Sequence, residues 1–105
     1  MPLKFAKPES RAADKRGRAG AKLQRWREVT LAVDRRDGFV CRGCTRGIAK
    51  GQRHHHHMRM RSCGGEDSTT NVVLLCALCH ADIHGYRLSI VGENADLTLR
   101  FVRSK

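Results

Sequence analysis

Two CxxC pairs constrain the fold of this chain more than any other feature of its sequence. The first pair is Cys41 and Cys44, and the second is Cys76 and Cys79. Four thiolates are a preferred tetrahedral donor set for zinc, so we predict one structural zinc site that joins both pairs. The alternative is two unrelated pairs of reduced cysteines. The 31 residues between Cys44 and Cys76 exceed the usual zinc-ribbon spacing, so an insert must separate the pairs.

The length of the chain explains why such a site would matter. A domain of 105 residues with one Trp, one Tyr and three Phe buries only a modest core. Structural zinc contributes on the order of 10 kcal/mol to the folding of small peptides. CxxC pairs without an apolar leader segment favour a reducing compartment, so we expect a cytoplasmic protein of a bacterial or phage-infected cell. No run approaches 18 apolar residues, so no membrane span is expected.

The positive charge is unevenly placed along the chain. The net charge of +11 divides into +6 for residues 1–37, +6 for residues 38–65 and −1 for residues 66–105. A polyanion is therefore the expected partner, and nucleic acid is the commonest one. For residues 1–19 alone, a solvated basic tail that aids solubility is an equal alternative.

Sequence patterns predict the order of elements. Residues 1–19 are expected to form a flexible basic arm, and residues 20–105 a single domain with its motif core at about residues 39–85. Apolar residues at helical spacing predict a helix from about Ala21 to Arg36, in which Trp26 is a core anchor or, alternatively, stacks on a base.

A strand through the histidine run, a loop, a strand at residues 72–75, and a helix from Cys76 to Gly85 should follow. A C-terminal hairpin over residues 87–91 and 97–102 completes an α+β fold.

All six histidines lie between His54 and His84. Four form the run His54–His57, while His80 and His84 are spaced to share one face of a helix. Neighbours on a strand point to opposite faces, so one histidine of the run can bind an ion while the next stays uncoordinated. A metal nuclease needs this division, because the ion stabilises charge on a phosphate while a neutral imidazole takes a proton from water. The alternatives are a fortuitous polar run, a metal-sequestering tract and a vector-derived tag.

The same stretch resembles the HNH endonucleases, which have the ββα-metal fold. The matching elements are the doublet His56-His57, the pair Gly64-Gly65 after six intervening residues, a central Asn and the segment CALCHADIH. The resemblance covers roughly residues 31–85 and is strongest to small zinc-bearing HNH proteins of phages and prophages. The ligand pattern that ends HADIH is also similar to that of the colicin-type DNases.

The resemblance implies a role for each matching residue. His57 would be the general base and Asn71 the residue that holds the loop between the strands. The catalytic ion, Mg²⁺, Mn²⁺, Co²⁺, Ni²⁺ or Zn²⁺, would bind three imidazoles, and the structural Zn²⁺ would bind the four cysteines already named. The three imidazoles belong to His56, His80 and His84.

The resemblance also implies DNA as the partner, cleaved with little sequence preference to leave a 5′-phosphate and a 3′-hydroxyl. The DNA is expected to be double-stranded, with phosphate contacts from Arg53, Arg59 and Arg61. The alternative function is a non-catalytic zinc-ribbon module that binds nucleic acid. Because four histidines are consecutive, a slip of one residue would make His55 and His56 the doublet. His54 and His55 are otherwise solvated strand residues or extra phosphate contacts, and Cys63 is expected to be a free thiol.

Overall fold

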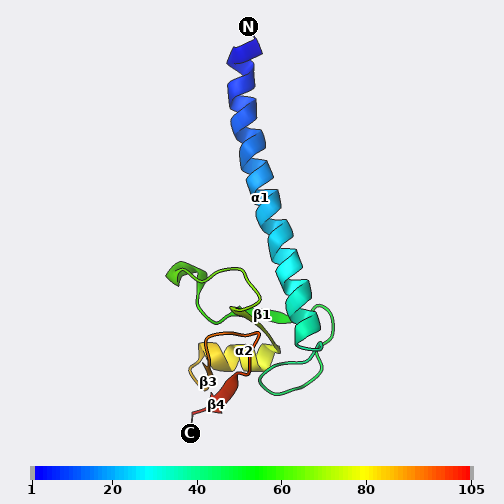
Figure 1. Cartoon of the computed structure of the whole chain (residues 1–105), viewed down its shortest axis with the longest axis vertical. Helices are drawn as coiled ribbons and strands as arrows, with labels where there is room; N and C mark the ends of the chain where they lie inside the picture. Colours follow the sequence, from blue (N-terminus) through cyan, green and yellow to red (C-terminus); the bar gives the residue numbers. More distant parts are fainter. Residues whose placement is uncertain (1, 105) are drawn as a thin grey trace.

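A computed structural model describes the backbone of residues 2–104 and the side chains of residues 19–104. Two helices and two antiparallel hairpins make up the fold, which confirms the predicted α+β class (Figure 1). The elements, in chain order, are α1 (Pro2–Arg36), β1 (His54–His57), the short 3-10 helix η1 (Arg61–Cys63), β2 (Val72–Leu75), α2 (Ala77–His84), β3 (Leu88–Val91) and β4 (Arg100–Arg103).

Helix α1 begins at Pro2, well before the predicted start at Ala21. The segment before Ala21 is rich in Ala, Lys and Arg, which have high helix propensity, so the helix can extend beyond its apolar stripe. The helix ends at Arg36, as the sequence predicted, and Gly38 just beyond it adopts a left-handed backbone with φ of 67°. The side chains of residues 1–18 lie outside the described part, and the division into an arm of residues 1–19 and a domain of residues 20–105 stays a prediction.

The central hairpin pairs β1 with β2 in a register that sets His56 opposite Val73. All four residues of β2 are fully buried, because α1 packs on this strand while β1 and the cysteine pairs enclose its other sides. A strand covered on both faces reads as a continuous apolar run, as VVLL does here. Each such side chain contributes about 1.5–3 kcal/mol, so β2 is the centre of the core.

Helix α2 begins after Cys76, whose side chain accepts a hydrogen bond from the backbone N–H of Cys79, and ends at Gly85. It packs against β1 and against β3 of the second hairpin. That hairpin is present as predicted, but β4 begins at Arg100 rather than near Leu97. The difference arises because residues 95–97 are used to bind the end of α1.

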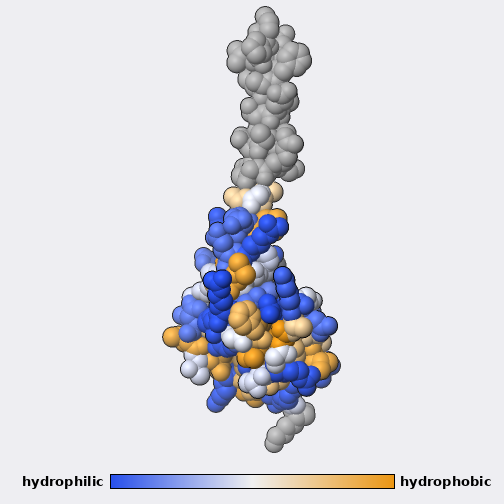
Figure 2. Space-filling model, turned by 90° about the vertical axis from the view of Figure 1, so that its right-hand side faces the viewer, coloured by the Kyte–Doolittle hydropathy of each residue, from blue (hydrophilic) through white to orange (hydrophobic). Residues whose placement is uncertain are grey.

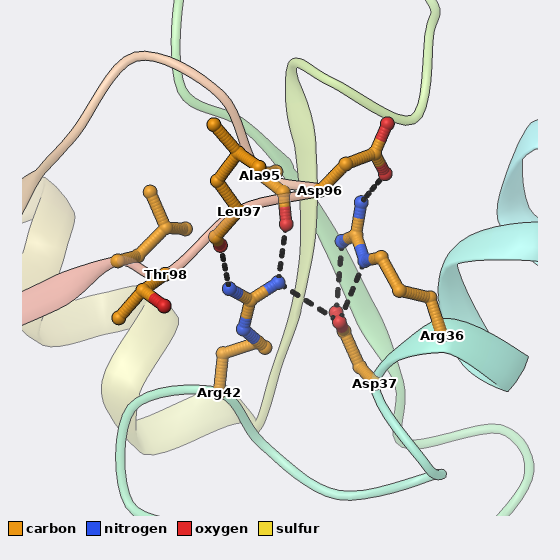
Figure 3. Close-up of a pocket in the computed structure, with 8 residues that line it drawn as sticks. Arg36, Asp37, Arg42, Ala95, Asp96, Leu97 and Thr98 are labelled. Atoms are coloured by element: carbon orange, nitrogen blue, oxygen red, sulfur yellow. Dashed lines mark hydrogen bonds and ion pairs between the residues drawn. The ribbon is translucent and has the colours of Figure 1, made fainter.

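Residues 95–97 are attached to the end of α1 and to Arg42 by a partly buried network of charges (Figure 3). Asp37, whose side chain is 1% exposed, accepts hydrogen bonds from Arg36, from Arg42 and from the backbone N–H of Leu74. Arg42 in turn donates to the carbonyl oxygens of Ala95 and Leu97. A surface hollow lies around Arg36 and Arg42. Because both guanidinium groups are already bound to protein oxygens, we interpret them as stabilising the fold and not as binding a ligand in this hollow.

Gly65 is required by the loop between β1 and β2. A Cβ atom at this position would lie 1.8 Å from the carbonyl oxygen of Arg59, which belongs to the backbone and has little room to move. We therefore expect Gly65→Ala to destabilise the domain by about 1–3 kcal/mol. Gly47→Ala is the matched control, because a Cβ atom there meets nothing within 4 Å. Chemical denaturation of both variants would measure the difference, and equal stability would contradict this account of the loop.

The described surface is largely hydrophilic on the face shown in Figure 2, with separate apolar patches over the domain. Within the described residues, no helix is both long and apolar enough to cross a membrane.

Candidate functional site

The four cysteines of the two CxxC pairs come together in the fold. Their sulfur atoms all lie within 4.8 Å of one another, and the sulfurs of Cys44 and Cys76 are 3.8 Å apart. Two sulfurs bound to one tetrahedral zinc ion are separated by about 3.8 Å, since each Zn–S bond is about 2.3 Å long. The cluster therefore fits the predicted structural zinc. Cys63 is exposed and lies outside the cluster.

The protonation state of each thiol in the cluster depends on the other three. Burial raises the pKa of Cys79, as do its bonds to the neighbouring thiols. Burial would also raise the pKa of Cys76, but hydrogen bonds from the Cys79 backbone and from the other thiols lower it to about 7. One thiolate forms readily in this cluster, while a full set of four requires a cation to offset the repulsion.

A second cluster forms from three histidines. The side chain of His56 on β1 meets those of His80 and His84 on α2. One ring nitrogen of each residue lies within 4.8 Å of the corresponding nitrogens of the other two. The Nε2 atoms of His80 and His84 are 3.0 Å apart, near the separation of about 3.3 Å for two imidazole ligands of one tetrahedral ion. The three residues could therefore hold a divalent ion.

The surroundings of His56 favour its neutral form, which can bind such an ion. Burial, together with the nearby His80 and His84, lowers the pKa of His56 to about 4. The pKa of His80 is also lowered, chiefly by burial. Both imidazoles are therefore neutral near pH 7, which is the form that binds metal ions. A set of three nitrogen donors leaves coordination positions for water or substrate.

The histidine run divides between the two faces of β1. His54 and His56 point to α2, where they meet His80. His55 and His57 point to α1, where both contact the Trp26 ring. The alternation places His56 in the histidine cluster and His57 beside it, which is the register indicated by the spacing to the Gly pair.

His57 is held by three neighbouring side chains. Its Nε2 donates to Asp67 at 2.7 Å, and its ring stacks on Trp26 with centroids 5.0 Å apart. Arg61 binds the same carboxylate through Nε at 2.8 Å and lies over the Trp26 ring. The hydrogen bond from Arg61 is the main reason that the pKa of Asp67 falls below its usual value. Asp67 is therefore a carboxylate, and it holds the His57 proton on Nε2.

Asn71 ties the two ends of the loop between β1 and β2. Its Oδ1 accepts from the backbone N–H of Arg59 at 2.8 Å. Its Nδ2 donates to the carbonyl oxygens of Arg59 and Glu66, each at 3.0 Å. These three bonds fix the loop that carries Asp67, the partner of His57.

The three arginines predicted to bind phosphate differ in their surroundings. Arg59 and Arg61 are exposed on the loop after β1, although Arg61 is also paired with Asp67. Arg53 is only 22% exposed, lies over the Phe39 ring and sits 3.6 Å from Asp34. Arg59 and Arg61 are thus the more accessible pair.

Two carboxylates near the site were not singled out from the sequence. Asp67 holds His57, and Asp34 on α1 accepts from His55 Nε2 at 2.7 Å. A single acidic residue, on a helix or in a turn, belongs to no sequence pattern that would pair it with a histidine 10 or more positions away. His55 and His57 each have a carboxylate partner at 2.7 Å, so this contact alone does not assign a role to either histidine.

The histidine cluster opens into a hollow of about 300 Å³ on the molecular surface. Its lining consists of five histidines and three residues of the loop after β1, namely His55, His56, His57, His80, His84, Met60, Arg61 and Ser62. The prospective ligands and the uncoordinated His57 therefore face one space that a substrate group can enter.

Comparison with known proteins agrees with these features. A family model described as HNH endonuclease matches residues 41–85, from the first residue of the cysteine cluster to the end of α2. Searches of curated proteins and of solved structures found no match. The matched segment contains both clusters, the central Asn71 and the β1–β2–α2 order. Residues 41–85 therefore match the HNH endonuclease family model, and the fold and clusters of this segment are consistent with an HNH core.

Proposed function

We propose that this protein is a metal-dependent endonuclease that hydrolyses phosphodiester bonds of DNA. The observation that carries the proposal is the meeting of His56, His80 and His84 at a hollow that His57 also lines. A zinc-ribbon module that only binds nucleic acid needs the cysteine cluster but has no use for this second cluster.

The arrangement assigns separate tasks to the residues of the hollow. A divalent ion bound by His56, His80 and His84 would supply positive charge to a phosphate oxygen and to the leaving oxygen. His57 is the general base, and because its Nε2–H is held by Asp67, Nδ1 is the nitrogen that takes the proton from water. Attack by that water breaks the bond from phosphorus to the 3′ oxygen. The 3′ oxygen leaves and takes up a proton from solvent, so the products are a 5′-phosphate and a 3′-hydroxyl.

The charge distribution supports double-stranded DNA as the substrate, bound mainly through phosphates. Arg59 and Arg61 stand on the loop beside the hollow, and α1 adds basic residues along its length. Phosphate contacts position a protein without reading sequence, so we expect weak sequence preference and affinity that falls steeply with salt. Reduced zinc thiolates and the small zinc-bearing HNH core support a phage-type enzyme of the bacterial cytoplasm.

Cleavage of supercoiled plasmid in the presence of Mg²⁺, Mn²⁺, Co²⁺, Ni²⁺ or Zn²⁺ tests the proposal. We expect nicked or linear plasmid with wild type, and at least a 100-fold slower rate with His84→Ala, which removes an exposed ligand without opening the core. Leu78→Ala, at an exposed position of the same helix, is the control and should cleave like wild type. A wild-type protein that binds DNA but leaves plasmid intact with every ion would favour the zinc-ribbon alternative.

A further inference from the structure

The proposed reaction assigns no task to His54 or His55 of the histidine run, but His54 contacts one of the prospective ligands of the ion. His54 pairs with Leu75 across the hairpin, and its side chain is half-buried on the α2 face of β1. Its Nδ1 lies 2.9 Å from Nδ1 of His80, with the two ring centroids 4.9 Å apart. This separation requires a hydrogen bond, so one of the two nitrogens carries a proton and the other accepts it.

The opposite nitrogen of His80 shows which of the two carries the proton. Nε2 of His80 faces Nε2 of His84 at 3.0 Å, on the side where the three-histidine cluster converges. A neutral imidazole that binds a cation through Nε2 must keep its proton on Nδ1. The Nδ1–H of His80 then points at His54, whose Nδ1 must be the acceptor.

We propose that His54 is a positioning residue that holds His80 in the tautomer and ring orientation required to bind the ion. His54 does not bind the ion itself in this account, because its Nδ1 is used by His80. The inference rests on the proposed ion site, and it concerns metal affinity rather than the chemical step. Partners of this kind typically raise metal affinity 10–100-fold.

His54 and His55 are neighbours on β1 and form a matched pair for testing this proposal. His54 contacts a prospective ligand through its ring nitrogen, while His55 points to the other face and donates to Asp34. Replacing either residue removes one partly buried imidazole from β1. Only the loss of His54 should change the affinity of the second ion site.

Calorimetric titration of Ni²⁺ into the zinc-loaded full chain measures this affinity directly. We expect His54→Ala to weaken Ni²⁺ binding 10–100-fold, His54→Gln to recover most of the loss through its amide oxygen, and His55→Ala to bind like wild type. Unchanged affinity in His54→Ala would overturn the inference. Equal loss in His54→Ala and His54→Gln would also overturn it, because it would make His54 a ligand.

A second readout uses the wild-type protein and does not depend on how the variants fold. With a diamagnetic ion such as Zn²⁺ in the site, long-range ¹H–¹⁵N spectra should show the proton of His80 on Nδ1. A proton on Nε2 would refute the inference. Binding of Ni²⁺ by His84→Ala with wild-type affinity would instead refute the ion site and the proposed function, so the two failures are distinguishable.

Discussion

His57→Ala should lose between about 100-fold and 10,000-fold in the rate of plasmid cleavage, the range expected for removal of a general base. The fold should survive, because Asp67 keeps its two bonds to Arg61 and is not left as an unpaired charge. Both clusters lie elsewhere, so the variant should keep its structural zinc and its affinity for DNA. Cleavage assays, zinc content and DNA binding measured on one preparation would check all three expectations.

His55→Ala is the matched control for this variant. His55 lies on the same face of β1, contacts the same Trp26 ring and also donates to a carboxylate. Its loss removes a similar imidazole without removing the base, and Arg53 remains 3.6 Å from Asp34, so we expect nearly normal cleavage. Asp67→Asn should show an intermediate loss, since it retains a hydrogen-bonding group but not the charge. Cleavage by His57→Ala at the wild-type rate would remove His57 from the mechanism.

Cys76→Ser should leave the domain unfolded. Cys76 supplies a thiolate to the first cluster, and it also accepts the first backbone hydrogen bond of α2. Structural zinc contributes on the order of 10 kcal/mol or more in small peptides, against a typical total stability of about 5–15 kcal/mol. A hydroxyl is a poor ligand for zinc, so most of this contribution should disappear. Circular dichroism and zinc analysis would measure the loss.

Cys63→Ser provides the control, since Cys63 is exposed and outside the cluster. It should keep one zinc ion in the cysteine site and unfold at the wild-type temperature. Treating the wild type with a strong chelator should reproduce the unfolding seen with Cys76→Ser. A folded, zinc-free Cys76→Ser protein would show that the cysteine cluster is not a structural metal site.

Much of the hairpin and of α2 could be predicted because their signals are local. The run VVLL is a buried strand, and the next residue begins a helix with its cysteine pair. The i, i+4 spacing of His80 and His84 sets both on one helix face, while alternation along β1 sets His56 toward them. The start of α1 was predicted too late, since an apolar stripe marks only the part of a helix that packs on a core.

The sequence by itself determined which cysteines and histidines could form the two clusters, because cysteine pairs, strand alternation and helical spacing act over a few positions. Only the tertiary structure decided which side chain each histidine meets. Asp34 with His55, His54 with His80, and Asp67 with His57 join residues 10–26 positions apart. A hydrogen bond between such residues depends on how the chain folds back on itself, and no periodicity records it.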